Sequence, residues 1–429
     1  MNIGNKEHKK AIIISIIDNS IEIKKLLQTL EYDVVNIFIQ HRKKPDVKSY
    51  IGLGKVEEIK KNIDYQYDKI DLIVINGDLK PSQWFYLEKN FNIKVFDRLR
   101  LILEIFKIRA DSKEAKLQVR LAELQYDKPY VMEIIHRSRN GEHPGFMAGG
   151  EYQVDDYFEM IKKQMKKIKI SLNKIRKERD IHRKNRVLKG FYLLSLAGYT
   201  NAGKSSILNL LSNEKIKVED KLFSTLSTTI RKIDNSNIPI LIIDTVGFID
   251  NLPAWMINAF HSTLEEIILS DLVLLIVDSS DDLNSLHQKI NTSFRELRDI
   301  GVNSEIIIVL NKIDLISKKD LENKISFLEN LEISKNRKII GISATNEKYI
   351  KNLLDLINKN LPNFVKIKVK FKSNQKTQSL INWIYDRAFV SNISYENENI
   401  LITIECSEFV KNLIISKLGS FIESDYYII

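Results

Sequence analysis

The residues best suited to chemistry form a glycine-rich loop between an apolar run and a helical stretch. Glycines there let backbone N–H groups turn toward phosphates, the lysine can reach the β- and γ-phosphates, and the serine hydroxyl can bind Mg²⁺. The pattern therefore predicts a phosphate-binding loop (P-loop) for a nucleoside triphosphate. The loop comprises Gly198, Tyr199, Thr200, Asn201, Ala202, Gly203, Lys204 and Ser205, and Ser206 follows in the helix.

Three later motifs, each at the end of an apolar run, predict that the nucleotide is GTP. Asp244 can hold the Mg²⁺ shell through water, and the Gly247 amide can contact the γ-phosphate. Asp314 can accept both the N1–H and N2–H₂ donors of guanine, a pair that adenine lacks. A doubly wound sheet binds nucleotides at such strand ends. The motifs are Asp244, Thr245, Val246 and Gly247; Asn311, Lys312, Ile313 and Asp314; and Ser343, Ala344 and Thr345, which suit a backbone contact to the base oxygen.

The segment between the P-loop helix and Asp244 should supply a threonine to Mg²⁺ and the γ-phosphate. Spacing leaves Thr225, Thr228 and Thr229 open as candidates. Phe248 stands where Ras-like GTPases carry the glutamine that orients the attacking water. A phenyl ring cannot do this, so we expect slow intrinsic hydrolysis and a water positioned by another group.

Alternating strands and helices must position these motifs. Between residues 189 and 362, near-continuous apolar runs alternate with helical stretches, which predicts a parallel sheet covered on both faces. Residues 1–98 show the same alternation on a smaller scale. In the tail, residues 363–429, Val365, Ile367 and Val369 alternate with lysines, which predicts a strand in a small α+β domain.

A long helical hairpin is expected over residues 99–188. One helix should run from Leu101 to about Leu124 and end before Pro129, and a glycine-rich loop should span Ser138–Gly150. The second helix repeats apolar residues at heptad spacing, which predicts an antiparallel seam. The fold class is thus α/β and multidomain: a small parallel α/β domain, a helical hairpin, a P-loop domain and a small α+β domain. The seam residues are Ile161, Met165, Ile168, Leu172 and Ile175.

Composition excludes several classes of protein. A length of 429 residues suggests two to four domains, and 44% hydrophobic with 28% charged residues is typical of a globular chain. Cys406 is the single cysteine, so a disulfide scaffold is excluded, and the histidines show no metal-ligand spacing. No apolar run reaches membrane-spanning length and the chain does not open on a signal sequence. We expect a cytoplasmic protein, with peripheral membrane association as a further expectation.

The net charge of +10 is concentrated in one stretch. Met160–Gly190 holds thirteen basic residues against only Glu178 and Asp180, so it accounts for the whole excess. Such a helix is either a solvated surface or a binding face for a phosphate backbone; the near absence of acidic residues favours RNA. The candidate RNA contacts are Lys162, Lys163, Lys166, Lys167, Lys169, Lys174, Arg176, Lys177, Arg183 and Lys184.

The sequence resembles the HflX family of ribosome-associated GTPases over nearly its whole length. The shared motifs are GYTNAGKS at 198–205, KLFSTL at 221–226, DTVGF at 244–248 and NKID at 311–314, with IGLGKVEEI at 51–59 and SKEAKLQVRLAELQY at 112–126 outside the P-loop domain. The resemblance implies that Thr225 is the switch I threonine and a Mg²⁺ ligand, acting in catalysis with Lys204 and Gly247. It places Phe223, Ser224, Thr225, Leu226 and Ser227 at the GTP site.

The resemblance also implies an enzyme that hydrolyses GTP, binds the large (50S-type) ribosomal subunit and its RNA, and splits or rescues stalled or idle ribosomes. Hydrolysis would control its release, and we expect a monomer. One departure stands out: many members carry a loop resembling GGxGxRGPGE between the hairpin helices, whereas this chain has NGEHPGFMAGGEYQV. This variant resembles archaeal members, and it leaves the contacts of the loop tip open.

Two features allow more than one interpretation. Potassium-activated GTPases similarly carry asparagine where Asn201 stands, which predicts either a K⁺ ion beside the phosphates or a hydrogen bond within the loop. Gly52-Leu53-Gly54-Lys55 is best interpreted as a turn that opens a helix, although the family is also implied to bind ATP in this region.

Two other functions were weighed against the main one. A ribosome-assembly GTPase similar to Era would need a dedicated RNA-binding fold, and the tail lacks a KH-type GxxG loop. An RNA-binding protein with a vestigial GTPase is disfavoured by intact Lys204, Ser205, Asp244 and Asp314.

Overall fold

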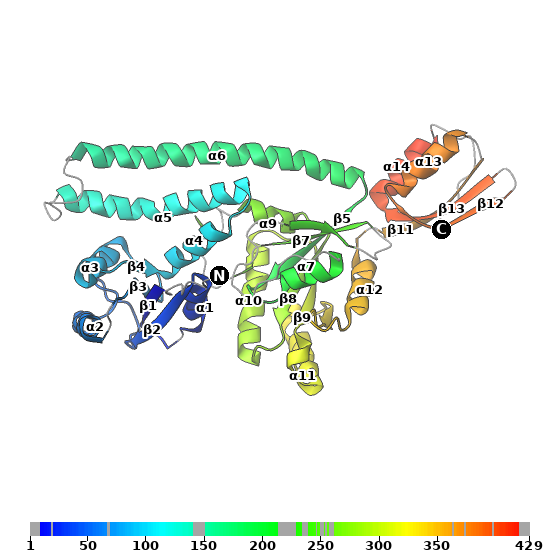
Figure 1. Cartoon of the computed structure of the whole chain (residues 1–429). Coiled ribbons are helices and arrows are strands. Elements are labelled where there is room, and N and C mark those ends of the chain that lie inside the picture. Colours follow the sequence, from blue (N-terminus) through cyan, green and yellow to red (C-terminus); the bar gives the residue numbers. More distant parts are fainter. Residues whose placement is uncertain are drawn as a thin grey trace, which may run out of the picture. The chain divides into compact units, whose positions relative to one another are not determined.

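The computed structural model forms two compact units, and each is considered by itself (Figure 1). Of the residues that the structure describes, those up to Asn173 together with residues 253, 255 and 256 belong to the first unit, and the others belong to the second. The structure describes residues 9–18, 20–66, 69–139, 151–212, 229–233, 239–245, 247–248, 253, 255–256, 261–362, 364–372, 375–396 and 399–419.

The first unit contains a four-stranded parallel sheet in the order β2-β1-β3-β4. Isoleucines such as Ile12, Ile14 and Ile73 are almost fully buried, as expected for a parallel sheet with crossover helices. The prediction for the N-terminal elements is confirmed. The strands are β1 (Lys9–Ser15), β2 (Tyr32–Ile39), β3 (Leu72–Ile75) and β4 (Val95–Asp97), and the helices are α1 (Ile21–Thr29), α2 (Leu53–Gln66) and α3 (Pro81–Phe91).

The predicted first hairpin helix is two helices, α4 (Arg98–Arg109) and α5 (Lys113–Arg139). The expected end before Pro129 is wrong, because Pro129 lies inside α5. A proline removes one helical hydrogen bond, but tertiary contacts hold the next turn in place. The Tyr130 ring stacks on Tyr126 and its hydroxyl donates to the Leu79 carbonyl oxygen at 3.1 Å.

The second hairpin helix, α6 (Glu151–Leu188), packs on α5 as the heptad spacing predicts. Leu121 and Leu124 of α5 form a buried cluster with Ile161 and Ile168 of α6, and Met165 packs against it. The antiparallel seam is therefore present. Of the predicted loop Ser138–Gly150, residues 138 and 139 belong to α5 and the remainder lies outside the described residues.

The second unit contains a six-stranded sheet in the order β10-β9-β8-β5-β7-β6. Five strands are parallel, as predicted, whereas β6 pairs antiparallel with β7 at the edge and was not predicted. Its short sequence, Thr229–Lys232, carries no continuous apolar run because an edge strand is only half covered. The other strands are β5 (Tyr192–Gly198), β7 (Ile240–Asp244), β8 (Leu272–Asp278), β9 (Glu305–Asn311) and β10 (Ile339–Gly341).

Helices pack against this sheet and bury its aliphatic core, which includes Leu194, Ile242 and Leu274. The helix after the P-loop strand, α7, packs against β7 and β5, and α9 also packs on β5. The helices are α7 (Lys204–Ser212), α9 (His261–Ile268), α10 (Leu283–Asp299), α11 (Lys318–Asn330) and α12 (Ile350–Asn360), with short 3₁₀ turns at Ile313–Leu315 and Glu332–Ser334.

The tail forms a three-stranded antiparallel sheet in the order β11-β13-β12, as the alternating pattern predicts. Ile367 and Val369 face a core shared with Ile384 and Ile414 of the two helices. The elements are β11 (Phe364–Lys372), α13 (Gln375–Tyr385), β12 (Phe389–Glu396), β13 (Asn399–Ser407) and α14 (Glu408–Gly419). Across the part of the chain that the structure describes, no helix combines the length and apolarity needed to cross a membrane.

Candidate nucleotide-binding site

The P-loop connects β5 to α7 with backbone angles that demand glycine at two positions. Gly198 has φ +135° and Gly203 has φ +95°, both in the region that side chains rarely adopt. A Cβ atom on Gly203 would lie 2.2 Å from Nδ2 of Asn311. Close approach of the third motif to the loop therefore excludes any larger residue at Gly203.

Lys204 is buried beneath this loop at the first turn of α7, with 7% of its surface exposed. Its Nζ donates to the carbonyl oxygens of Gly198 at 3.0 Å and Tyr199 at 2.7 Å. Burial lowers the pKa of Lys204 to about 8, against the opposing effect of Asp244. The ammonium group is thus held at the loop, where a bound phosphate would meet it.

Ser205 and Asp244 meet across the ends of α7 and β7. The Ser205 hydroxyl donates to Oδ2 of Asp244 at 2.6 Å, and Asp244 is fully buried. A hydroxyl and a carboxylate oxygen side by side form the donor set that suits Mg²⁺, which keeps several waters and takes phosphate oxygens as further ligands. In the described part of the chain no cluster of three or more His, Cys, Asp or Glu could hold a metal by itself.

The second motif lies directly on the P-loop. Phe248 N–H donates to the Gly198 carbonyl oxygen at 3.0 Å, and Thr200 N–H donates to the Phe248 carbonyl oxygen at 3.1 Å. A Cβ atom on Gly247 would stand 2.8 Å from both Lys204 Nζ and the Cα atom of Thr200. Gly247 is thus placed beside the lysine, while the Phe248 side chain is only 7% exposed.

The third and fourth motifs meet at the ends of β9 and β10. The Asn311 side chain donates through Nδ2 to the Ala202 carbonyl oxygen at 2.9 Å and accepts through Oδ1 from Ala344 N–H at 3.1 Å. The Ser343 hydroxyl hydrogen-bonds to Oδ1 of Asp314. Asn311 therefore ties the P-loop to the base-binding motifs, and Asp314 lies beside the Ser343 segment.

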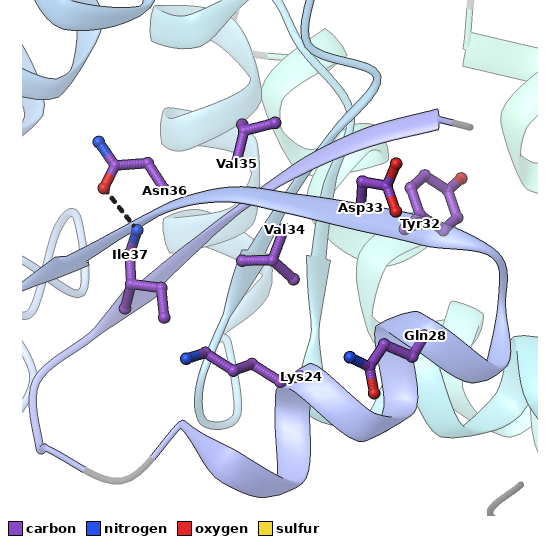
Figure 2. Close-up of a pocket in the computed structure, with 8 residues that line it drawn as sticks. All are labelled: Lys24, Gln28, Tyr32, Asp33, Val34, Val35, Asn36 and Ile37. Carbon is purple, nitrogen blue, oxygen red and sulfur yellow. Dashed lines mark hydrogen bonds between the residues drawn. The ribbon is translucent and has the colours of Figure 1, made fainter. Parts of the chain in front are cut away.

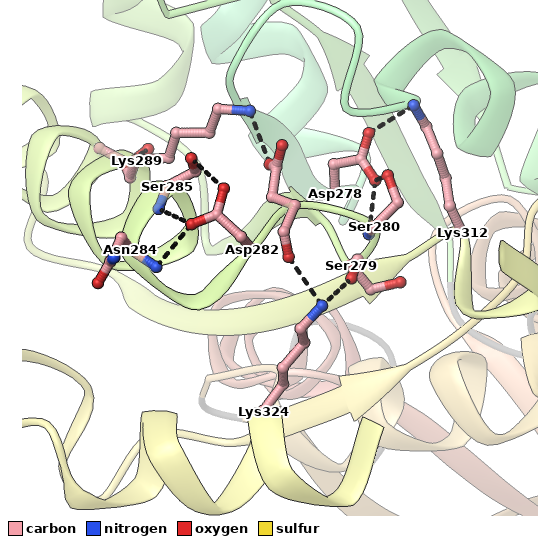
Figure 3. A network of polar contacts seen from close by, with 11 residues as sticks. Asp278, Ser279, Ser280, Asp282, Asn284, Ser285, Lys289, Lys312 and Lys324 are labelled. Atoms are coloured by element: carbon pink, nitrogen blue, oxygen red, sulfur yellow. Dashed lines mark hydrogen bonds and ion pairs between the residues drawn. The ribbon is translucent and has the colours of Figure 1, made fainter. Parts of the chain in front are cut away.

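Lys312 is fixed by a residue that the sequence reasoning missed. Its backbone has φ +66°, and its Nζ donates to Oδ2 of Asp278 at 2.6 Å (Figure 3). Burial raises the pKa of Asp278, but the hydrogen bonds from Lys312 and Ser280 outweigh burial and lower it. Asp278 ends an apolar strand just as Asp244 does, and that position was the available signal.

The loop after Asp278 is braced by two more lysines, from α10 and α11 (Figure 3). Lys324, which is 8% exposed, donates to the carbonyl oxygens of Ser279 at 2.6 Å and Asp281 at 2.7 Å. Lys289 pairs with the Asp281 carboxylate at 2.6 Å. These contacts hold the loop that follows Asp278, the partner of Lys312.

Several predicted GTP contacts lie outside the described residues: Phe223, Ser224, Thr225, Leu226, Ser227 and Val246. Their roles stay predictions. The structure brings the other motifs together at one edge of the six-stranded sheet, from residues that are far apart in the sequence. Thr245 belongs to the scaffold of this edge, because its hydroxyl donates to the Leu196 carbonyl oxygen at 2.7 Å.

Most of the candidate RNA contacts on α6 face solvent. Lys162, whose Nζ pairs with Glu159 at 2.8 Å, is exposed, and so are Lys163, Lys166, Lys167, Lys169, Lys174 and Lys177. Arg176 is exposed as well, but its Nη2 lies 2.6 Å from the Glu265 carboxylate of α9. Arg183 differs from the expectation: it is half-buried and lies between Asp180 and Glu266. The side chain of Lys184 lies outside the described residues.

A separate groove of about 500 Å³ lies between α1 and the edge strand β2 (Figure 2). Its lining combines Lys24 and Gln28 of the helix with the strand from Tyr32 to Ile37, and it includes none of the predicted nucleotide contacts. The nearby Gly52–Lys55 segment opens α2, as the turn interpretation predicts, with Gly52 N–H bound to Oε1 of Gln40 at 2.7 Å. ATP binding in this region stays a prediction.

A doubly wound sheet with a P-loop lysine, a Ser–Asp pair and an Asn-Lys-x-Asp motif at its strand ends defines a P-loop GTPase. The chain matches the models of the GTP-binding GTPase N-terminal region over 18–107, the GTP-binding GTPase middle region over 109–186 and the 50S ribosome-binding GTPase over 194–312. It is 40% identical to GTPase HflX of Thermococcus kodakarensis, over 87% of this chain and 85% of that one. It therefore belongs to the HflX family of GTPases and hydrolyses GTP.

Further relatives agree with this assignment. GTPase HflX of Methanocaldococcus jannaschii is 38% identical, over 90% of this chain and 92% of that one. Among solved structures, the SsGBP–GDP complex is 29% identical, covers 82% of this chain and 98% of its own, and has a TM-score of 0.50. The similarity to archaeal relatives that the loop sequence suggests is thus supported.

Proposed function

We propose that this GTPase binds the large ribosomal subunit, splits or rescues stalled or idle ribosomes, and leaves after GTP hydrolysis. The observation that carries the proposal is the solvent-facing basic surface of α6, which includes Lys163, Lys166 and Lys167. Phosphate contacts by lysine release counterions from RNA and supply most of the affinity in such complexes. The match to a model described as a 50S ribosome-binding GTPase supports the choice of partner. Ribosomes place this action in the cytoplasm.

The nucleotide is held in this proposal by groups that the fold already gathers. Backbone N–H groups of the P-loop and Lys204 bind the phosphates, and Asp314 selects guanine through two hydrogen bonds. Asn311 hydrogen-bonds to both Ala202 and Ala344, and so fixes the phosphate-binding loop relative to the base-binding motifs. Lys312, positioned by Asp278, covers the base.

The Mg²⁺ ion would be held by Ser205, by Thr225 and, through water, by Asp244. When bound, it would neutralise charge on the β- and γ-phosphates. The Ser205 hydroxyl donates to the Asp244 carboxylate at 2.6 Å, so the two oxygen atoms that would hold the ion lie side by side. The K⁺ ion predicted at Asn201 would add to this charge, and equal hydrolysis rates in KCl and NaCl would exclude it.

Phe248 takes no direct part in hydrolysis in this proposal. Its ring is buried and its backbone bonds to Gly198 and Thr200, so the residue holds the second motif on the P-loop instead of positioning water. The water must be oriented by another group, and the ribosome-bound state is where we expect that group to be ordered. We therefore expect slow GTP turnover by the free protein.

Sucrose-gradient sedimentation tests the proposal. The full-length protein is mixed with 70S-type ribosomes and GDP, GTP or a non-hydrolysable GTP analogue. We expect co-sedimentation with the large subunit and a shift from 70S to free subunits with the analogue, and little of either with GDP. Binding to the small subunit alone, or no binding at all, would contradict the proposal.

A further inference from the structure

Four arginines on α6 form a single row that is distinct from the exposed lysines. Arg176, Arg179, Arg183 and Arg186 follow each other at spacings of three, four and three, which places them on one face of the helix. This row faces two consecutive glutamates, Glu265 and Glu266, in the middle of α9. The contacts are ion pairs within the second unit.

The carboxylates are almost completely buried by this row. Glu265 is 5% exposed and Glu266 is 1% exposed. Glu265 accepts from Arg176 Nη2 at 2.6 Å and from Arg179 Nη2 at 3.1 Å. Glu266 lies 3.2 Å from Arg186 Nη2 and 3.6 Å from Arg183 Nη2, and 3.9 Å from Arg179 Nε. Arg179 contacts both carboxylates and Arg183 also pairs with Asp180 at 3.0 Å, so removing Glu265 would chiefly affect Arg176 and removing Glu266 would chiefly affect Arg186.

The helix that carries these glutamates lies next to the nucleotide machinery. It follows the Asp244–Phe248 motif in the sequence, and it packs on β5, the strand that ends in the P-loop. The Ser195 hydroxyl of β5 donates to the Glu266 carbonyl oxygen at 3.3 Å. A change at Gly247 or in the P-loop therefore has a short path to Glu266.

The numbers of charges on the two helices are unequal, and this has a mechanical consequence. Four guanidinium groups at near-heptad spacing face two carboxylates, so a shift of α9 by one turn along α6 would give each glutamate arginine partners again. Packed helices change register in such discrete steps because intermediate positions leave charges unpaired. The contacts of 3.6 and 3.9 Å show that Glu266 already lies within reach of a second and a third arginine.

We propose that the arginine row is a register joint, in which the nucleotide state selects which arginines hold Glu265 and Glu266. Because the exposed Lys174 and Lys177 lie on the same stretch of α6 as the row, a register change also displaces part of the basic surface. The joint would thus link the γ-phosphate to the basic surface. This inference does not depend on the proposed ribosome function, since its tests contain no ribosome.

Nucleotide affinities of two end variants test the joint. Arg176→Gln and Arg186→Gln each remove the arginine at one end of the row. After a one-turn shift, the arginine at one end no longer faces a carboxylate, whereas the arginine at the other end still does. We therefore expect the two variants to differ from each other by about fivefold in the ratio of affinities for a non-hydrolysable GTP analogue and GDP. Glu178→Gln, which removes an exposed charge from the same helix, is the matched control and should keep the wild-type ratio. Equal, wild-type ratios in both end variants would overturn the joint.

Hydrogen exchange on the unaltered protein gives a second measurement that no folding defect can obscure. Peptides from residues 174–188 and 261–268 should exchange at different rates in the GDP and GTP-analogue states, because the pairing differs. Residues 53–66 of α2 serve as an internal reference whose exchange stays the same. Identical exchange of both joint peptides in the two states would contradict the proposal.

Discussion

At the scale of single residues, the nucleotide site depends on two glycines and one buried lysine. Gly203 is required both by its φ of +95° and by the nearness of Asn311, whereas Gly301 has a similar φ of +88° with no neighbour near its Cβ position. A comparison of Gly203 with Gly301, which lies outside the nucleotide motifs, therefore separates the effect of backbone strain from the effect of a steric clash. Lys204 adds a charge that burial makes sensitive to pH.

Gly203→Ala should abolish tight nucleotide binding. The methyl group displaces Asn311 and breaks its bridge from Ala202 to Ala344, so we expect GDP affinity to fall by about a hundredfold, on the order of 3 kcal/mol. Gly301→Ala is the control: it should cost about 1 kcal/mol of stability and leave affinity unchanged. Fluorescent-nucleotide titration measures both. An unaltered affinity in Gly203→Ala would show that the loop can move away from Asn311.

GDP affinity should decrease as the pH rises through about 8. In the free protein Lys204 loses its proton above its pKa of about 8, whereas phosphates bind the protonated form and raise that pKa. Binding then takes up a proton, and affinity falls by up to about tenfold per pH unit above 8. Calorimetry in buffers of different ionisation enthalpy at pH 8.5 measures the uptake. Absence of proton uptake would mean that Lys204 has the same protonation state in the free and the nucleotide-bound protein, which would contradict the prediction.

Phe248→Leu should retain GTP turnover within about threefold of the wild type. Leucine keeps an apolar side chain in the buried site, and the hydrogen bonds to Gly198 and Thr200 are made by the backbone. Phe248→Ala should lose about 3 kcal/mol of stability through the cavity it leaves, with chemistry still intact in the folded fraction. Single-turnover hydrolysis with and without ribosomes measures this. A large loss in the leucine variant would give the ring a direct role.

At the scale of elements, α6 has two differently used basic faces. The lysines of α6 whose side chains the structure describes face solvent, while the arginines from Arg176 to Arg186 contact α9. A count of charges cannot distinguish these faces, because each lysine and each arginine adds one positive charge to the net charge of +10. Whether a basic side chain of α6 is solvated or paired depends on its position around the helix and on the two buried glutamates of α9.

Replacing both Lys166 and Lys167 by glutamine should weaken ribosome binding and flatten its salt dependence. Each lost phosphate contact lowers the slope of log affinity against log salt by about one. Nucleotide affinity should stay unchanged, since neither lysine belongs to the nucleotide motifs, whose described residues all lie in the second unit. Lys318 and Lys319, which are consecutive and exposed on α11, form the matched control pair. Equal loss from both pairs would indicate nonspecific attraction to RNA.

At the scale of the whole molecule, the two compact units predict how unfolding responds to nucleotide. All described nucleotide motifs belong to the second unit, so GDP at a hundred times its dissociation constant should stabilise that unit by about 2.7 kcal/mol. Calorimetry should show two transitions, of which only one moves upward with GDP. A single transition that moves as a whole would mean that α6 couples the units into one cooperative structure.

Most of the strands and the order of the motifs could be predicted from the sequence. Buried parallel strands have continuous apolar runs, and a P-loop must lie between a strand and a helix, so Gly198–Ser205 was placed correctly on local grounds. The end of α5 and the strand β6 could not be predicted. Pro129 is tolerated because Tyr130 is held by Leu79, and β6 depends on pairing with β7.

The sequence by itself determined that this chain binds a guanine nucleotide, because hydrogen-bonding groups at fixed spacings need only the correct strand ends to meet. Only the tertiary structure decided which charges are available for a partner. Asp278 joins the site through Lys312, and Arg179 and Arg186 are used by Glu265 and Glu266. Such roles depend on contacts between residues distant in sequence, and burial, not residue type, sets whether a charge is solvated or paired.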